Sequence, residues 1–194
     1  MNRILFGAAL AASFVAPLAA QAQTIPAAII AVTDLDRVTA ECTACKTASA
    51  ALRSQAQALQ AREKALTDPL AAEQRAIQAA VDALAGKEPD AALRSRVTQW
   101  QTKQQSAAQE LQRSQQQIQR NQQYIQQQIA QKLGPIYQQV MQRRGANVML
   151  ERGSTLATGT ALDVTNEVLS ALNTAMPTIA TTAPAETQTT PQSR

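Results

Sequence analysis

The chain has 194 residues and a formal net charge of +4, a length that suits one domain or two small ones. Its 40 alanines and 28 glutamines dominate the composition, whereas Phe, Trp and Tyr together make up only 3% of the residues. Large apolar side chains, each worth about 1.5–3 kcal/mol when buried, are therefore scarce, and one thick hydrophobic core is not expected. Because Ala and Gln both favour helix, the composition predicts long, thin helices that pack along their length.

Several classes of chemistry are excluded by the residue counts. The chain has no histidine, only two cysteines and six scattered glycines. A histidine-based triad, a histidine metal site, a four-cysteine zinc site within one chain and a glycine-rich phosphate loop are therefore excluded. We expect no catalytic residue, no metal and no cofactor, and a protein that is not an enzyme.

Residues 1–22 have the layout of a secretory signal peptide. Arg3 precedes an apolar run over residues 4–15, and Ala20-Gln21-Ala22 provides a small-x-small cleavage site before Gln23. The alternative is a membrane-anchoring helix, but the run is shorter than the roughly 20 residues that span a bilayer. Cleavage and export to the periplasm of a Gram-negative bacterium, an oxidising compartment, are therefore expected.

The first half of the mature chain is predicted to hold one strand and one long helix. Residues 27–32 form a short apolar run with β-branched members, typical of a buried strand. The helix then extends to about Leu84, since its apolar residues alternate at steps of three and four, as in a coiled coil. They form two rows: Val38, Cys45, Leu52, Leu59 and Leu66, and Cys42, Ala56, Leu70, Ile77 and Leu84.

A second long helix is predicted after a turn at residues 86–90, which contain Gly86 and Pro89. It runs from about Ala91 to Arg144 with the same apolar spacing, and we expect a kink near Gly134-Pro135. Two arms of similar length joined by a tight turn predict an antiparallel helical hairpin over residues 37–144, with its tip near residues 85–90.

The remaining residues predict a small body and a tail. Residues 147–151 and 155–158 read as short strands, and Asp163 can cap a helix over residues 164–173. We therefore expect an α+β, mainly α fold, in which residues 23–36 and 145–173 form a β body that is marginal alone and stabilised by oligomerisation. Residues 174–194, rich in Thr, Pro and Ala, predict a disordered tail.

The two predicted arms differ in charge. Residues 37–90 hold seven basic and seven acidic residues, whereas residues 91–145 hold eight basic residues and only Glu110. Such a basic stripe attracts anionic partners, although it can equally be an ordinary solvated helix face. In an exported protein we expect anionic lipid, lipopolysaccharide or acidic polypeptides rather than nucleic acid. The electrostatic candidates are Arg94, Arg96, Lys103, Arg113 and Arg120.

The ends of the mature chain resemble the Skp/OmpH family of periplasmic chaperones. The opening segment, residues 28–38, is similar to the family's first strand. Residues 146–151 look like its strand after the hairpin, and residues 163–169 (Asp-Val-Thr-Asn-Glu-Val-Leu) look like the start of its closing helix. The resemblance implies a homotrimer whose hairpins surround a cavity and hold unfolded outer-membrane proteins without ATP. It also implies that lipopolysaccharide is a possible partner. A structural coiled-coil adaptor that joins two envelope proteins is the alternative.

Apolar residues near the predicted tip are the candidates for client contact. Unfolded outer-membrane proteins expose alternating apolar residues, and a binder for many such clients needs diffuse apolar contacts rather than one pocket. The same residues can instead hold the two arms together, an alternative that weighs more for those on the apolar rows than for Val81 and Trp100. The candidates are Val81, Leu84, Leu93, Val97 and Trp100.

Cys42 and Cys45 are the main departure from the family pattern, which commonly has Ser-Pro-Ala-Gly at this point. The spacing and the compartment permit a disulfide. Two buried thiols, a thioredoxin-type redox pair and a zinc ion shared between subunits remain as alternatives.

Overall fold

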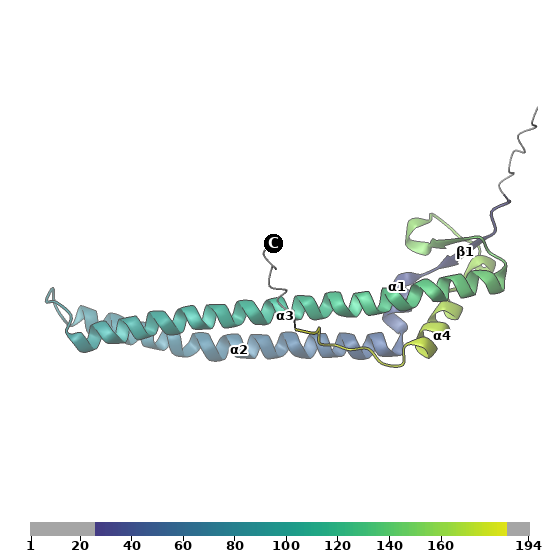
Figure 1. Cartoon of the computed structure of the whole chain (residues 1–194). Helices are drawn as coiled ribbons and strands as arrows, with labels where there is room; N and C mark the ends of the chain where they lie inside the picture. Colours follow the sequence, from purple (N-terminus) through teal and green to yellow (C-terminus); the bar gives the residue numbers. More distant parts are fainter. Residues whose placement is uncertain (1–25, 186–194) are drawn as a thin grey trace, which may run out of the picture.

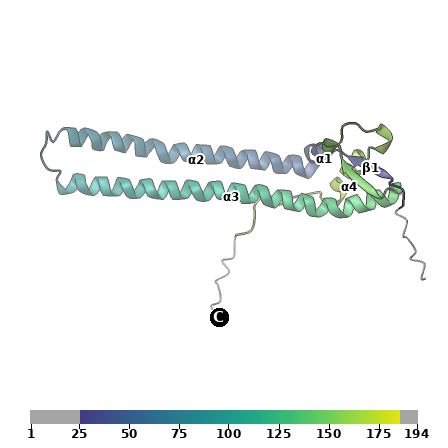
Figure 2. The same ribbon diagram turned by 90° about the horizontal axis from the view of Figure 1, so that it is seen from above.

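A computed structural model describes residues 26–185 of the chain, so the predicted signal peptide and residues 186–194 lie outside it. Two long helices, α2 (Thr43–Asp82) and α3 (Ala91–Arg144), lie side by side and extend away from a small body at one end (Figures 1 and 2). Residues 83–90 join the two helices at the end far from the body. We call α2 and α3 together the helical pair.

The body contains all the other elements. Both ends of the described chain contribute to it, as the chain passes through the helical pair between the first and second strands. The elements around the pair are β1 (Ile30–Thr33), α1 (Leu35–Glu41), β2 (Val148–Glu151), the short 3-10 turns η1 (Arg152–Ser154) and η2 (Thr160–Leu162), and α4 (Thr165–Ala175).

β1 and β2 form a two-stranded parallel sheet in which Ile30 lies opposite Val148. Asn147 sets this pairing just before β2 begins. Its side-chain oxygen accepts a hydrogen bond from the Ile29 N–H at 2.7 Å, and its side-chain nitrogen donates to the Ala27 carbonyl at 2.8 Å. The predicted meeting of the two terminal strands is therefore present, although β1 begins at Ile30 rather than at residue 27.

The first long helix does not start where the apolar spacing predicts. α1 begins after Asp34, whose carboxylate accepts a hydrogen bond from the Arg37 N–H at 2.8 Å, and it ends at Glu41. Cys42 then adopts an extended ψ of 128° and serves as the N-cap of α2, with its sulfur accepting from the Cys45 N–H at 3.2 Å. The prediction of one continuous helix from residue 37 is thus wrong. The spacing of apolar residues did not reveal the break, because a single non-helical residue leaves that spacing intact.

α3 begins with Asp90 as its N-cap, which accepts from the Leu93 N–H at 2.7 Å. It continues through Gly134 and Pro135 and stops at Gly145. Gly145 has a φ of 64°, in the left-handed region where a residue without Cβ is favoured. This turn directs the chain into β2.

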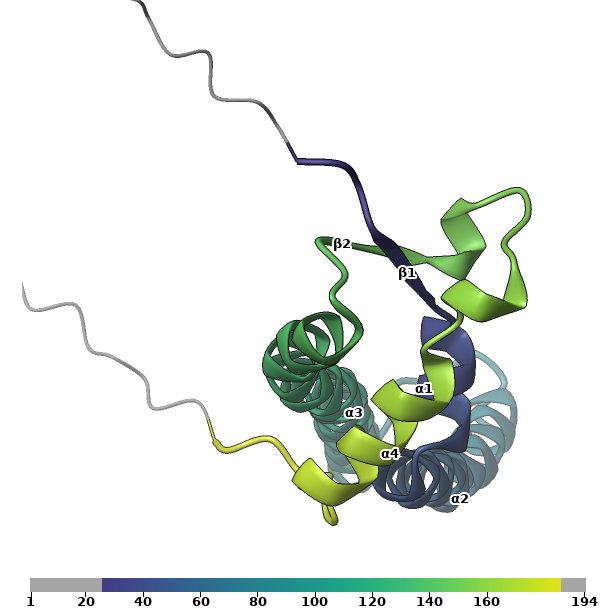
Figure 3. The ribbon, with the colours of Figure 1, turned by 90° about the vertical axis from the view of Figure 1, so that its right-hand side faces the viewer.

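The apolar core lies where α3 extends past the start of α2. Val140, Val168 and Leu172 are fully buried there, and Val38 of α1 and Met176 belong to the same cluster. Seen end-on in Figure 3, α4 runs obliquely beside α3, and it contacts α3, α1 and β1. About 14 residues of α3 therefore serve the body rather than the arm, which explains why α3 is longer than α2.

Away from the core, the helical pair is held by a thin seam. The predicted apolar positions from Leu52 to Leu84 are partly buried, but Ala56 is exposed and the neighbouring Gln55 is partly buried in its place. A polar side chain thus occupies the interior of the seam. No helix among residues 26–185 is sufficiently long and apolar to span a bilayer.

Two predictions for the C-terminal part differ from the structure. Residues 155–158 form no strand; they connect η1 and η2, and only an isolated bridge between Val32 and Asp163 extends the sheet there. The tail predicted to be disordered from residue 174 instead completes α4 to Ala175, and residues 176–185 then follow the helical pair. Composition misled here, because the contacts of this segment come from the surface on which it lies.

Candidate functional site

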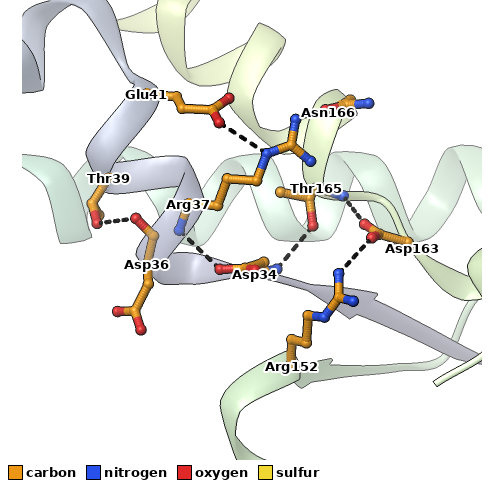
Figure 4. Close-up of polar contacts among 9 residues, drawn as sticks. All are labelled: Asp34, Asp36, Arg37, Thr39, Glu41, Arg152, Asp163, Thr165 and Asn166. Carbon is orange, nitrogen blue, oxygen red and sulfur yellow. Dashed lines mark hydrogen bonds and ion pairs between the residues drawn. The ribbon is translucent and has the colours of Figure 1, made fainter. Parts of the chain in front are cut away.

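The two family-like motifs meet in the body, at the start of α1 and of α4 (Figure 4). The Asp34 N–H donates to the Thr165 hydroxyl at 2.9 Å, and the Arg37 guanidinium donates to the Asn166 side chain at 2.7 Å. Arg37 also donates to Glu41, one turn further along α1, at 3.1 Å. Residues more than 125 positions apart in the sequence are thereby joined by their polar groups.

Asp163 is the second anchor of this cluster. Its carboxylate accepts from the Thr165 N–H at 2.8 Å and faces Arg152 at 3.3 Å. Hydrogen bonds from Thr165 hold the pKa of Asp163 below its ordinary value, because they stabilise the charged carboxylate. The adjacent Val164 N–H donates to the Val32 carbonyl at 2.8 Å. The motif residues therefore fasten the body together.

A groove of about 490 Å³ lies between α2 and α3, midway along the helical pair. We call it the central groove. Its apolar wall includes Leu66, Pro69, Leu70 and Ala107, and its polar rim includes Glu73, Lys103 and Glu110. Pro69 lies inside α2, and the helix continues past it. An apolar surface with a charged rim suits a chain segment or a lipid tail better than a small polar molecule.

Trp100 lies beside this groove and contributes to the pairing of the helices. Its indole N–H donates to the Leu70 carbonyl of α2 at 2.9 Å, and the side chain is partly buried. The structure thus gives Trp100 an inter-helix role, the alternative that the sequence analysis ranked lower for it.

The other client-contact candidates lie at the end of the helical pair that is far from the body. Val81 is 40% exposed, an unusual value for a valine in this protein. Leu84, Leu93 and Val97 are partly buried. Val81 belongs to α2, Leu84 to the turn at residues 83–90, and Leu93 and Val97 to α3. We call these four side chains the tip cluster.

Two ion pairs connect the arms. Arg96 donates to Glu73 at 2.5 and 3.1 Å, and Arg62 donates to Glu110 at 2.6 Å. These hydrogen bonds lower the pKa of both carboxyl groups, because each guanidinium stabilises the ionised form. The one acidic residue of the second arm is therefore part of a link between the helices.

The predicted electrostatic residues do not form one site. Arg96 is paired with Glu73, whereas Arg94, Lys103 and Arg113 are exposed and form no ion pair within residues 26–185. Arg120 is partly buried and donates to Gln117, while its Nε has no hydrogen-bond partner within the described chain. Three of the five predicted cations are thus available to bind an anionic partner.

Cys42 and Cys45 form a disulfide across the start of α2. Their Cα atoms are 5.1 Å apart, and Cys42 is fully buried. The pair lies at the break between α1 and α2, and both cysteines belong to the apolar core. The disulfide closes a very short loop, and its burial in the core indicates a structural role. Among residues 26–185, no group of three or more acidic or cysteine side chains could hold a metal ion.

Three polar residues that the sequence analysis did not single out also lie between the arms. Asn121 is only 3% exposed, and its amide nitrogen donates to Gln55 of α2 at 2.9 Å. Gln128, two turns further along α3, forms hydrogen bonds with Ala180, which follows α4. The sequence held one indication of this site: Asn121 is the one asparagine in residues 91–144, where glutamine is the usual uncharged polar residue.

The chain is similar to proteins of one family in sequence and fold. The family described as outer membrane protein (OmpH-like) matches residues 29–172. No curated protein sequence is significantly similar to the chain. A crystal structure from Caulobacter crescentus CB15, of a protein assigned as an OmpH-like outer membrane chaperone, superposes with a TM-score of 0.69 at 22% identity. The match covers 88% of this chain and all of that one.

The ion pairs make the helical pair sensitive to acid. A carboxylate with a lowered pKa stabilises the folded state fully above its unfolded value of 4.5, and this stabilisation is lost as the pH falls through the folded pKa. We expect the melting temperature to fall by a few degrees below about pH 4.5 because of these groups. Glu73→Gln should lower it near pH 7 and flatten its pH dependence, as circular dichroism can measure. The same substitution at exposed Glu63 is the control, and equal effects would contradict this account.

The disulfide should protect both cysteines from alkylation. We expect the mass of the unfolded protein to be unchanged by iodoacetamide, and to increase by two carbamidomethyl groups after reduction. Closing so short a loop stabilises a protein by about 2 kcal/mol in the chain-entropy model, so reduction should lower the unfolding midpoint accordingly. Alkylation of the unreduced, unfolded protein would show two thiols instead.

Proposed function

Because this chain belongs to the OmpH-like family, which matches residues 29–172, we propose that it is an ATP-independent holdase chaperone in the periplasm. Its clients are unfolded outer-membrane proteins, whose aggregation it prevents. Family membership over most of the chain is the observation that carries this proposal. The predicted signal peptide over residues 1–22 supports the periplasmic location.

The shape of the molecule supports a holdase. We infer that α2 and α3 form the antiparallel hairpin predicted from the sequence, which projects from the body as a thin arm (Figure 2). Its apolar surface is spread over the tip cluster and the central groove rather than gathered in one deep pocket. Diffuse contacts of this kind tolerate clients of many sequences, since no single side chain is required to fit.

The charged residues of α3 supply a second, longer-range attraction. Exposed Arg94, Lys103 and Arg113 lie on one arm and carry positive charge toward solvent. They would steer acidic segments of clients, or the anionic headgroups of lipid and lipopolysaccharide, toward the hairpin. Repulsion between like-charged arms would also keep hairpins of neighbouring subunits apart. Nucleic acid is not a proposed partner.

The body has the features of an oligomerisation surface, and we propose a homotrimer. Leu156 is fully exposed, and Ile29, Leu150 and Leu162 are 54%, 38% and 40% exposed. β2 ends the two-stranded sheet, so its outer edge offers unpaired main-chain groups. Exposed apolar side chains beside an open sheet edge indicate contact with another chain. Three bodies joined in this way would place three hairpins around a shared space.

The holdase function predicts suppression of aggregation. Dilution of several unrelated outer-membrane proteins from urea should give less light scattering in the presence of this protein at near-stoichiometric ratio, without ATP. Val81→Asp should raise the concentration needed for half protection roughly two- to fourfold, since one exposed apolar contact is weakened.

Ala79→Asp is the matched control for that variant, because it adds the same charge at an exposed position two residues away. Equal loss of protection in both variants would show that charge, rather than the tip cluster, matters. A coiled-coil adaptor would instead bind one folded partner and protect none of the unfolded clients.

The trimer predicts a definite mass. Light scattering at micromolar concentration should give the mass of three protomers, and Leu156→Asp should shift it toward one, because a charge would be buried at the interface. The helical content should be unchanged, as Leu156 makes no core contact within its own chain. A monomeric mass for the unsubstituted protein would contradict the proposed assembly.

A further inference from the structure

The segment after α4 lies along the helical pair as an extended strap, comprising residues 176–185 (Figure 1). It starts in the core: Met176 is 4% exposed, and Ile179 packs against the same cluster. The chain then leaves the core and passes along the seam between α2 and α3. From Ala180 onward it has no helical or strand structure, so its main-chain groups have no partners within the segment.

Side-chain amides of the helical pair bind the main chain of this strap. Gln128 contacts Ala180 in both directions: its Nε2 donates to the Ala180 carbonyl at 2.9 Å, and its Oε1 accepts from the Ala180 N–H at 3.1 Å. Asn121 Oδ1 accepts from the Ala183 N–H at 2.8 Å, and Gln55 Nε2 donates to the Thr181 carbonyl at 3.3 Å. The three amides thus pair with the strap as a neighbouring β-strand would.

The amides are held in position by one another. Asn121 Oδ1 also accepts from Gln117 at 2.8 Å, and Asn121 Nδ2 donates to Gln55 Oε1 at 2.9 Å. Because Asn121 is almost fully buried, these bonds fix its orientation toward the strap. We call Gln55, Asn121 and Gln128 the amide site.

The strap itself supplies little side-chain binding. Its last six residues are Ala, Thr, Thr, Ala, Pro and Ala, and the four hydrogen bonds from the amides to the strap all go to its main-chain atoms. Main-chain atoms are common to every polypeptide, so the site does not require this particular sequence. The strap is kept in place mainly because it is tethered to α4, which raises its effective concentration at the site.

Apolar surface continues beyond the strap along the same seam. Thr182 borders a pocket that Leu59 and Ile118 line, and the central groove lies further toward the tip. An extended segment lying on the amide site could therefore place its own apolar side chains in these hollows. Folded proteins cannot do so, because their main-chain groups are already paired.

We propose that the amide site binds the main chain of extended, unfolded polypeptide, and that the strap occupies it in cis as an intramolecular competitor. This inference rests on the proposed chaperone function and specifies where and how a client would bind. The ligand is a polypeptide segment with unpaired main-chain N–H and C=O groups and apolar side chains at intervals. Removal of the strap should strengthen client binding, since the competing occupant is lost.

The test compares two shortened chains. One ends after Ile179, which retains the core contacts of Met176 and Ile179, and the control ends after Ala185. The probe is a fluorescently labelled eight-stranded outer-membrane barrel protein, unfolded in urea and diluted, with anisotropy as the readout. The chain ending at Ile179 should bind with a Kd roughly three- to tenfold lower than the control. Equal Kd values for the two chains would overturn the proposal.

The amide site is tested in the chain that ends at Ile179. Gln128→Ala should weaken probe binding and cancel most of the gain, whereas the same substitution at exposed Gln127 should leave it unchanged. Circular dichroism should show the same helical content in all the variants, as both residues lie on the surface of α3 away from the core cluster. Equal effects of the two substitutions would also overturn the proposal.

A second readout separates this inference from the proposed function. If no chain binds the unfolded barrel, the holdase function fails, and a synthetic peptide of residues 178–185 then probes the amide site directly. Added to the chain that ends at Ile179, this peptide should shift the side-chain amide NMR signals of Gln55, Asn121 and Gln128. Absence of such shifts at millimolar peptide would overturn the inference, whatever the outcome with the barrel.

Discussion

The whole molecule depends on one small core in which both ends of the chain meet. Val38 from α1, Val140 from α3 and Leu172 from α4 are fully buried against one another, whereas the helical pair beyond them has only a thin seam. A helix pair so poor in large apolar residues gains little free energy from its own packing. The hydrogen bonds of Asp34 and Arg37 with Thr165 and Asn166 therefore stabilise the body from which the two arms extend.

The arms themselves are joined by polar contacts at intervals. From the tip toward the body, the pair is linked by Arg96 with Glu73, by Trp100 with the Leu70 carbonyl, by Arg62 with Glu110, and by Asn121 with Gln55. Such links are directional and individually weak, because most are partly exposed to water. They keep the helices aligned while leaving apolar surface uncovered between them. That combination of a defined arm with accessible grooves is what a binder of diverse unfolded chains requires.

The abundance of glutamine acquires a physical meaning in this setting. An exposed helix face could equally have been built from Lys and Glu, which are also good helix formers. An amide differs in that it both donates and accepts without carrying charge, so it can pair with either main-chain group of a peptide. The contacts of Gln128 with Ala180 show one amide doing both at once. A surface rich in such groups is suited to polypeptide main chain, independent of sequence.

The sequence by itself determined the presence of two long helices, the bounds of the second of them and the meeting of the terminal strands. These follow from local rules: apolar spacing, Asp and Gly at helix ends, and short β-branched runs. Tertiary structure decided the rest. The break at Cys42 is invisible to periodicity, because one extended residue leaves the apolar spacing intact. Trp100 pairs the two helices, because its indole N–H finds a hydrogen-bond acceptor in a carbonyl of the other helix. Residues 176–185 follow the helical pair because side-chain amides more than 50 positions away in the sequence bind their main chain. A segment of Ala, Thr and Pro has no conformational preference strong enough to predict its course, so only the surface that receives it can set its path.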